Sequence, residues 1–358
     1  MASATPPAKT PKKPMRILID LQHPAELHVF KNLAALLREA GHETLCTGRD
    51  KDILADLARA QGEPVRMFGR AGKGALRLGL ELFYRQFHLL RIIREFRPDL
   101  ILAVGGAFVA LPGRLLGVPV HIFYDTEHAR VANMLSYPFA AGIHVPDCYN
   151  RPIRQPHDVY PGYHALAYLH PNRFCPDPAV PAALGLAPGE RYAVVRYVAW
   201  EAGHDIGLHG FSPAMRVEAV RRLAALGRVF VSAEGPLPKA LEPYRCAVPV
   251  ERMHDLLAFA GLTFGESATM ASEGAVLGVP GVYVDPVGRG YTDDLERRYG
   301  LVRNFAPERE EEAVATATAI FAAGDREEWM ARRRRLLSEK IDVTAHMLAV
   351  VNQALGLS

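Results

Sequence analysis

Apolar residues along the chain fall into two alternating kinds of segment. Short runs of consecutive apolar and β-branched residues are typical of buried strands, and longer stretches with a helical period follow them. In the first half this pattern predicts strands at 15–20, 42–47, 65–68, 99–105, 118–125 and 142–146, and helices at 24–40, 50–61, 74–96 and 107–116. Strands separated by helices indicate βαβ units and therefore a parallel sheet.

The alternation stops at residues 147–190, which are rich in proline, aromatic residues and histidine, and then starts again. The second half predicts strands at 191–198, 228–233, 261–265 and 281–286, and helices at 213–226, at 253–260 and from 308 and 325 onward. We therefore expect an α/β protein with two tandem Rossmann-like, doubly wound parallel-sheet domains facing a cleft. The expected divisions are a disordered tail at 1–14, domains at 15–172 and 173–340, and a C-terminal helix at 341–358.

Composition narrows the class of protein. The chain has 358 residues, of which 49% are hydrophobic and 23% charged, as in soluble globular proteins. A net charge of +3 gives no general electrostatic reason to expect nucleic acid as a partner. Four dispersed cysteines without a CxxC pair indicate reduced thiols, and hence a cytoplasmic protein. No apolar run reaches the length of about 18 residues that a membrane span needs, and the basic N-terminus lacks the apolar region of a signal peptide.

The stretch GESATMASEGAVLGVP, residues 265–280, ends a predicted strand and opens a helix of small residues. Ligands of parallel sheets bind beyond the carboxyl ends of strands, where helix N-termini favour anions. Small residues would let a phosphate approach the backbone, and Ser267 and Thr269 would add hydroxyl donors, while Glu273 suits a ribose diol. The spacing leaves open an alternative, in which this is a capped helix packed on the sheet, with Glu273 on a solvated face.

Four separated motifs carry a resemblance to known families. They are DLQHPAELHVFKNL (20–33), GYHALAYLHPNRF (162–174), VVRYVAWEAGHDIG (194–207) and the 265–280 stretch. In this order they resemble a bacterial and archaeal family of GT-B-like proteins catalogued as a domain of unknown function, number 354, over roughly residues 15–301. The last motif, the first loop and the segment 104–140 also resemble GT-B glycosyltransferases, including the lipid II N-acetylglucosaminyltransferase, and UDP-N-acetylglucosamine 2-epimerases.

The resemblance implies a GT-B-like fold and a nucleotide-sugar-dependent glycosyltransferase of surface polysaccharide or glycolipid biosynthesis. The N-terminal domain would bind the acceptor and the C-terminal domain the nucleotide sugar, with the last helix returning to the first domain. Two alternatives stay open. One is a 2-epimerase-like enzyme that uses Asp20, Glu127 and Glu266 for elimination, and the other is a non-catalytic nucleotide-sugar binding protein. No metal and no cofactor are expected, and the lack of GxGxxG after the first strand disfavours an NAD-dependent dehydrogenase.

The resemblance also assigns site residues. His28 matches the position of the general base, for which an imidazole has a suitable pKa, with His23 as second choice; either histidine could instead cap or pack the first helix. Glu127 is an acceptor binder or an acid–base group. The expected acceptor-side residues are Asp20, His23, Gly105, Gly106 and Asp125. The expected nucleotide and donor residues are Arg196, Gly265, Glu266, Ser267, Ala268, Thr269, Glu273, Thr292 and Asp293, with His204 and Asp205 on the same wall. Arg196 would neutralise the diphosphate, or would be a salt-bridged arginine at a strand end.

The predicted helix at 74–96 is basic and rich in leucine and aromatic residues. Such a helix can lie on an anionic membrane surface or meet a lipid-linked acceptor. The simpler interpretation, which we favour at this point, is a crossover helix buried against the sheet. The expected partners are thus a nucleotide-sugar donor and a lipid-linked or saccharide acceptor, in the cytoplasm or peripherally at the inner membrane.

Overall fold

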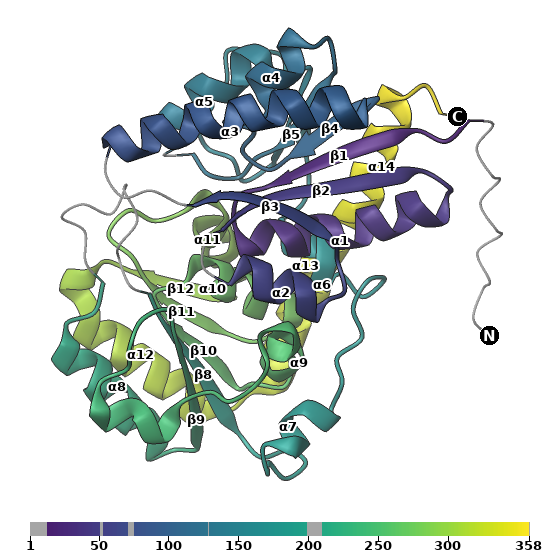
Figure 1. The fold of residues 1–358 in the computed structure, drawn as a ribbon. Helices are drawn as coiled ribbons and strands as arrows, with labels where there is room; N and C mark the ends of the chain where they lie inside the picture. The colour runs from purple at the N-terminus through teal and green to yellow at the C-terminus, as the bar shows by residue number, and fades with distance from the viewer. Residues whose placement is uncertain (1–12, 51–52, 71–74, 128, 199–209, 358) are drawn as a thin grey trace, which may run out of the picture. The chain divides into compact units, whose positions relative to one another are not determined.

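The chain forms two compact units, each with its own parallel sheet (Figure 1). The computed structural model of the protein describes residues 13–50, 53–70, 75–127, 129–198 and 210–357. Unit 1 contains the described residues of 13–147, 151–160 and 342–357, and unit 2 contains those of 148–150 and 161–341. Residues 1–12 of the expected tail lie outside the described residues.

The sheet of unit 1 has seven strands in the order β3-β2-β1-β4-β5-β6-β7, and every pairing is parallel. The strands are β1 (Arg16–Leu21), β2 (Glu43–Asp50), β3 (Val65–Arg70), β4 (Leu100–Ala103), β5 (Val120–Phe123), β6 (Gly142–Pro146) and β7 (Asp158–Tyr160). β4 is buried along its whole length and β1 everywhere except Arg16. Continuous burial is typical of central parallel strands that are covered on both faces.

The helices of unit 1 are α1 (Pro24–Glu39), α2 (Leu54–Ala60), α3 (Ala75–Phe96), α4 (Ala110–Leu115), α5 (Arg130–Ser136) and α14 (Val343–Ala354). Local chemistry fixes where α1 begins, because His23 Nδ1 accepts a hydrogen bond from the backbone N–H of Ala25 at 3.2 Å and Pro24 occupies the first turn. α14 begins in a similar way, with Asp342 as its capping residue. It packs against α1, so the end of the chain belongs to unit 1.

Unit 2 has a five-stranded parallel sheet in the order β12-β11-β10-β8-β9. Its strands are β8 (Tyr192–Tyr197), β9 (Arg228–Ala233), β10 (Leu262–Gly265), β11 (Gly281–Val284) and β12 (Val302–Phe305). Its helices are α6 (Leu166–Leu169), α7 (Ala179–Ala183), α8 (Pro213–Ala224), α9 (Met253–Ala258), α10 (Ala268–Leu277), α11 (Gly290–Asp294), α12 (Glu310–Ala323) and α13 (Arg326–Glu339).

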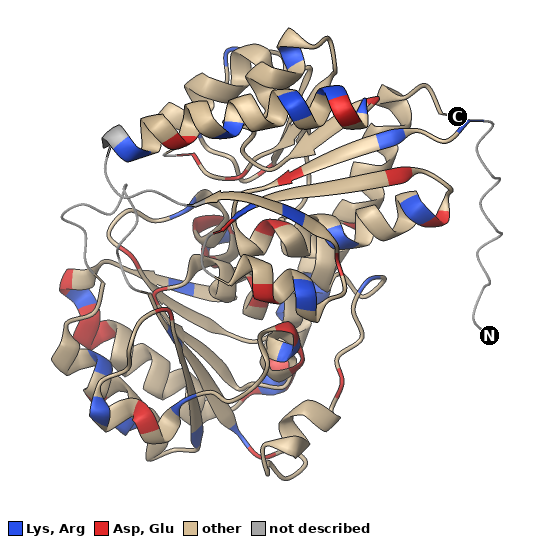
Figure 2. Cartoon of the chain, viewed as in Figure 1, with Lys and Arg blue, Asp and Glu red and all other residues tan. Residues whose placement is uncertain are grey.

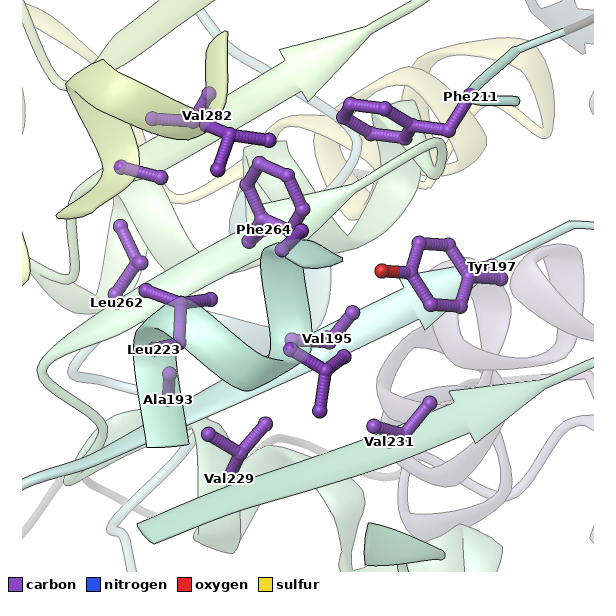
Figure 3. Close-up of a cluster of buried hydrophobic side chains, with 14 of the residues drawn as sticks. Ala193, Val195, Tyr197, Phe211, Leu223, Val229, Val231, Leu262, Phe264 and Val282 are labelled. Atoms are coloured by element: carbon purple, nitrogen blue, oxygen red, sulfur yellow. The ribbon is translucent and has the colours of Figure 1, made fainter. Parts of the chain in front are cut away.

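An apolar core lies between one face of this sheet and the helices α8 and α12. Alternate residues of β8 contribute to it, as expected where side chains of a strand point to opposite faces in turn. Figure 3 shows Val195, Phe264 and Leu223 of this cluster, and the rings of Phe211 and Phe264 lie 5.0 Å apart. This core holds the strands whose carboxyl ends carry the predicted nucleotide residues.

The division between the units differs from the predicted boundary at 172/173, because the chain passes to unit 2 after Tyr160. β7 still pairs with β6 in the first sheet. Farther along, the hydroxyl of Tyr163 donates to Asp294 at 2.6 Å and that of Tyr168 to Glu273 at 2.8 Å. These contacts hold the 163–169 segment in unit 2.

The α/β class with two parallel sheets is confirmed. Six short strands and α-helices among the described residues were not predicted: β7, β12, α5, α6, α7 and α11. β7 is only three residues long and lies inside the proline-rich 147–190 segment, while β12 is an edge strand with the polar sequence VRNF. In both cases pairing with a neighbouring strand, rather than apolar periodicity, decides the structure.

Candidate functional site at the carboxyl ends of the strands

In the sheet of unit 2, the loops that follow the adjacent strands β8 and β10 lead to opposite sides of the sheet. β8 is hydrogen-bonded to both β10 and β9; the chain continues from β8 to β9 on one side and from β10 to β11 on the other. In open parallel sheets, ligands bind beyond the carboxyl ends of the strands at such a switch point. The loop after β10 is the turn into α10, and residues 199–209 after β8, with the predicted His204 and Asp205, lie outside the described residues.

Gly265, the last residue of β10, permits this turn. Its φ is +137°, and a Cβ added to it would lie 2.1 Å from the carbonyl oxygen of Arg196. A side chain therefore fits neither the conformation nor the space. The turn runs closely against the end of β8, and Glu266 N donates to the same Arg196 carbonyl at 2.9 Å.

The helix that follows, α10, is capped by a serine and has no acidic residue in its first turn. Ser267 Oγ caps it by accepting from Met270 N at 3.3 Å, and the first turn starts at Ala268. Ser267 and Thr269 are partly exposed. The first N–H groups of a helix and the helix dipole attract anions. The chemistry of this turn therefore suits a phosphate group.

Glu266 is fully engaged within unit 2. Its carboxylate accepts from Arg216 Nη2 at 2.8 and 2.9 Å, from Phe211 N at 2.7 Å and from Val198 N at 3.0 Å. The side chain is buried. These contacts connect the segments before and after residues 199–209 to the turn between β10 and α10. Glu266 therefore positions this turn through contacts within unit 2. Sequence reasoning did not identify Arg216, whose pairing with Glu266 depends on the fold.

Glu273 is buried, so the alternative that placed it on a solvated face is wrong. Its Oε1 accepts from the hydroxyl of Tyr168 at 2.8 Å and lies 2.8 Å from His254 Nε2. The carboxylate is thus oriented by its own chain before any ligand arrives. Its proposed contact with ribose stays a prediction. Neither partner has a local sequence signal, since one precedes the second sheet and the other lies on α9.

Arg196 has the contacts of a salt-bridged arginine at a strand end. Its guanidinium donates to Ser232 Oγ at 2.7 Å and to Glu234 Oε1 at 3.0 Å, and 24% of the side chain is exposed. Glu234 therefore offsets part of the charge that was expected to neutralise a diphosphate. The role itself stays a prediction.

The loop after β11 supplies a cation that sequence reasoning missed. Asp285 is buried and accepts from Val287 N at 2.6 Å and Gly288 N at 2.7 Å, which folds the loop back on the strand. Arg289 follows, and its Nη1 lies 3.6 Å from Asp285 Oδ1. The sequence signal was available, as an arginine between two glycines directly after a strand.

Of the two donor-sugar candidates in this loop, only one is at the surface. Thr292 is fully buried, and its hydroxyl donates to the carbonyl of Arg289 at 3.0 Å, which makes it a helix-start residue of α11. Asp293 is exposed.

Unit 1 has its own switch point between β1 and β4, because the chain runs outward from β1 to β3 and, in the other direction, from β4 to β7. The loop after β1 contains His23 and the loop after β4 contains Gly105 and Gly106. The predicted acceptor-side residues are thus brought to one edge of the sheet, with Asp125 and Glu127 in the loop after the adjacent strand β5.

Asp20, at the end of β1, is enclosed by its own chain. It accepts from Thr47 Oγ1 at 2.8 Å, from Arg85 Nη2 at 3.1 Å and from the amide of Gln22, and 1% of the residue is exposed. Burial raises the pKa of the Asp20 carboxyl, while the positive charge of Arg85 opposes that shift. The contacts make Asp20 a positioning residue for the loop after β1.

The two histidines of the first loop have the structural contacts that were left open as alternatives. His23 is exposed and caps α1. His28 is buried on α1, with Nδ1 3.4 Å from Gln61 Nε2 at the end of α2. Glu127 is also buried. The structure leaves the catalytic roles of His28 and Glu127 as predictions.

The two glycines after β4 serve the packing of unit 1. A Cβ at Gly106, whose φ is +70°, would lie 2.6 Å from Ile122 Cγ2, and one at Gly105 would lie 3.2 Å from the ring of Tyr124. The close approach predicted for a substrate is therefore made by residues of β5 and the loop after it.

Parts of the chain and its whole fold have similar known proteins. Residues 15–152 match the family described as Protein of unknown function (DUF354). The UDP-N-acetylglucosamine--N-acetylmuramyl-(pentapeptide) pyrophosphoryl-undecaprenol N-acetylglucosamine transferase of Pseudomonas aeruginosa (strain UCBPP-PA14) is 34% identical over 125 residues, which cover 32% of this chain and 35% of that protein. The protein of the same name from Methylococcus capsulatus is 30% identical over 164 residues, which cover 38% of this chain and 45% of the relative. The chain thus spans about a third to a half of these curated relatives.

Solved structures match nearly the whole chain. The S. aureus MnaA–UDP structure has a TM-score of 0.71 at 12% identity and covers 96% of this chain and 98% of that one. The UDP-GlcNAc 2-epimerase of Neisseria meningitidis bound to UDP-GlcNAc also scores 0.71, at 12% identity, over 96% and 100%. Acinetobacter baumannii MurG scores 0.59 at 14% identity over 95% and 100%. The GT-B-like fold is therefore confirmed. No helix among the described residues is both long and apolar enough to cross a bilayer.

Proposed function

We propose that this protein is a nucleotide-sugar-dependent glycosyltransferase that acts in surface polysaccharide or glycolipid biosynthesis in the cytoplasm. The observation that carries the proposal is the turn from β10 into α10, where Gly265 and the Ser267 cap present a helix N-terminus at the switch point of unit 2. Curated relatives named as N-acetylglucosamine transferases, and solved structures of the same fold with UDP or UDP-GlcNAc, support it.

The proposed reaction divides the work between the two units. Unit 2 holds the donor, with the diphosphate at the start of α10 and the ribose at Glu273; Arg289 joins the predicted residues as a cation for the phosphates. Unit 1 binds the acceptor. An acceptor hydroxyl attacks the anomeric carbon, the bond from that carbon to the diphosphate oxygen breaks, and His28 takes the hydroxyl proton. The nucleoside diphosphate leaves with the bonding electron pair, stabilised by the N–H groups of the helix.

Thr269→Asp separates donor binding from folding. Residue 269 lies in the first turn of α10, where a carboxylate favours the unliganded helix by about 0.3–1 kcal/mol but repels a diphosphate. We expect the variant to melt at or above the wild-type temperature and to bind UDP or UDP-GlcNAc at least about tenfold more weakly, or ~1.4 kcal/mol. Isothermal titration calorimetry and thermal shift measure both quantities.

The matched control is Thr269→Asn, which has a similar shape without the charge and should keep most of the affinity. UDP, GDP and CDP are compared in parallel, because the base is not assigned. Unchanged UDP-sugar affinity in Thr269→Asp would show that the phosphates bind elsewhere and would remove the main support for the proposal.

The 2-epimerase-like alternative is kept because the Neisseria meningitidis UDP-GlcNAc 2-epimerase structure has a TM-score of 0.71, against 0.59 for MurG. Two of the three carboxylates assigned to its elimination chemistry, Asp20 and Glu266, are buried in ion pairs with Arg85 and Arg216. These ion pairs favour transfer over epimerisation.

Incubation with UDP-GlcNAc alone distinguishes the two reactions, since only an epimerase turns over UDP-GlcNAc without an acceptor. Binding without turnover on any acceptor would instead support a non-catalytic nucleotide-sugar binding protein.

α3 favours a lipid-linked acceptor. One face of the helix is buried through Leu89, Ile92 and Ile93, as expected for a crossover helix, but its other face carries exposed apolar residues. The exposed fractions are 62% for Leu80, 73% for Phe83 and 57% for Phe87, and basic positions recur along the helix in Figure 2. Exposed aromatic residues beside arginines are typical of helices that lie on anionic membranes.

We expect the wild-type protein to sediment with vesicles that contain anionic lipid and Phe83→Ser/Phe87→Ser to lose at least about half of that binding, because each aromatic side chain buries apolar surface in the interface. Ile53→Ser is the control, since Ile53 is an exposed apolar residue of unit 1 that lies at the N-cap of α2, away from α3 in sequence. Equal sedimentation with neutral vesicles, or no effect of the double substitution, would contradict membrane contact through α3.

A further inference from the structure

Three side chains that can bind a metal converge in unit 1, away from the predicted acceptor residues in sequence. They are His144 on β6, Asp158 on β7 and His346 on α14, and one ligand atom from each lies within 4.8 Å of the others. His346 Nε2 is buried and makes no hydrogen bond to any described residue, although it lies 3.4 Å from Asp158 Oδ2. A buried ring nitrogen directed at a carboxylate without a hydrogen bond calls for another partner.

The separations of the ligand atoms fit a tetrahedral ion. Zn–N bonds of about 2.0–2.1 Å and Zn–O bonds of about 2.0–2.2 Å put neighbouring ligand atoms about 3.3–3.5 Å apart. His144 Nδ1 lies 3.2 Å from Asp158 Oδ2, and His346 Nε2 lies 3.4 Å from the same oxygen. Two of the three edges are therefore close to this length, and the third is no longer than 4.8 Å.

A neighbouring histidine can orient His144 as a metal ligand. His144 Nε2 lies 3.0 Å from His121 Nδ1 on β5. When His144 binds an ion through Nδ1, its Nε2–H can donate to His121, which is how a second residue orients a metal-binding histidine.

Gly142 provides the space for this arrangement. A Cβ at this position would lie 2.6 Å from His121 Nδ1 and 2.9 Å from His144 Nε2. The ring of His346 packs 4.9 Å from that of Tyr160, the last residue of β7, which holds it over the strands. Gly142 and Tyr160 thus pack against the histidines of the cluster.

We propose that His144 Nδ1, Asp158 Oδ2 and His346 Nε2 form a structural binding site for a divalent transition metal of the Zn²⁺ type. The ion links β7, the last strand before the chain leaves unit 1, to α14, the helix in which the chain returns to it. With 50% of Asp158 exposed, water can complete the coordination. The expectation that the transfer reaction needs no metal stays a prediction, because the proposed ion is structural. It is independent of the proposed transferase function, because the donor residues belong to unit 2.

The test uses untagged full-length protein, stripped with chelator and dialysed against Zn²⁺. Mass-spectrometric metal analysis should find about one zinc per chain in the wild type and less than about a fifth of that in His346→Gln and Asp158→Ala. His157→Ala is the matched control, because His157 is an exposed histidine next to the site and should leave the zinc content unchanged. Co²⁺ should give the visible absorption of a tetrahedral site in the wild type and the control only.

Folding is checked separately. Asp158 is half exposed, so Asp158→Ala should show the circular dichroism and the melting temperature of the metal-free wild type. Added Zn²⁺ should raise the melting temperature of the wild type by a few degrees and leave that of Asp158→Ala unchanged. Zinc-free wild-type protein, or equal zinc in His346→Gln and the wild type, would overturn the proposal. Nucleotide-sugar binding does not enter any of these measurements.

Discussion

Gly265→Ala is expected to destabilise unit 2 by about 3 kcal/mol or more. Two costs add at this position. The backbone has a φ of +137°, which residues with a side chain rarely adopt, and the new methyl group would lie 2.1 Å from the Arg196 carbonyl oxygen. That oxygen belongs to the backbone of a central strand, so it cannot move without opening the β8–β10 pairing.

The loss should be accompanied by loss of nucleotide binding, because the turn positions the first residues of α10. Urea unfolding followed by circular dichroism measures the first effect and the UDP-induced thermal shift the second. Gly235→Ala is the control, since a Cβ there would meet nothing within 4 Å. A midpoint shift for Gly265→Ala as small as that of Gly235→Ala would show that the turn is more adaptable than its geometry indicates.

Features that depend on neighbouring residues could be read from the sequence. Apolar runs such as that of β1, and helical periods such as that of α1, located most strands and helices. A strand buried on both faces leaves a continuous apolar run, whereas a helix that buries one stripe leaves a repeat of about 3.6 residues. The turn at Gly265 was also predictable. A glycine at a strand end, a serine cap and small residues after it are local requirements of a strand-to-helix turn.

Features that depend on contacts between distant parts of the chain could not be predicted from the sequence. Asp20 and Glu266 looked like cleft acids, but Arg85 and Arg216 neutralise them, and these arginines lie 65 and 50 residues away along the chain. Glu273 likewise meets Tyr168 at a separation of 105 residues. The His144–Asp158–His346 cluster has no short motif, because its members come from two strands and the last helix.

Strand order explains why the residues predicted for each site lie at one edge of their sheet, whatever their roles. Each predicted loop follows a strand, and parallel strands bring all such loops to one edge of their sheet. The sequence could therefore locate the edge at which His23 and Gly105 meet in unit 1 without revealing which side chains face their own chain. The position of each predicted residue followed from the strand order. The partners of its side chain depend on packing across the fold.

Arg85→Met is expected to lower the free energy of unfolding by about 3–5 kcal/mol at neutral pH, because it leaves the buried Asp20 carboxylate without its counter-charge. Neither side chain is accessible, with 0% of Arg85 and 1% of Asp20 exposed. Methionine keeps an unbranched apolar stem but loses the guanidinium, whose central carbon lies 4.4 and 5.1 Å from the ring centroids of Phe68 and Phe108. These cation–π contacts are lost together with the ion pair.

The dependence on pH tests that cause. Burial already raises the pKa of Asp20 above 3.8, and removal of Arg85 takes away an interaction that lowers it. In the variant the folded protein then holds the Asp20 proton more tightly than the unfolded chain does. Lower pH favours the folded form, so the deficit should be full at neutral pH and shrink as the pH falls toward 3.8. Urea unfolding of variant and wild type at a series of pH values measures it.

Asp20→Asn/Arg85→Met completes the argument, because it removes both charges and should recover a large part of the loss. A buried ion pair can often be replaced by neutral groups at little cost in stability. A single buried charge left without its partner is strongly destabilising. Arg59→Met is the control for loss of an arginine, since 78% of Arg59 is exposed in its pair with Asp56 and its removal should cost under about 1 kcal/mol. A double variant no more stable than Arg85→Met, with a deficit independent of pH, would mean that Arg85 acts through packing rather than through its charge.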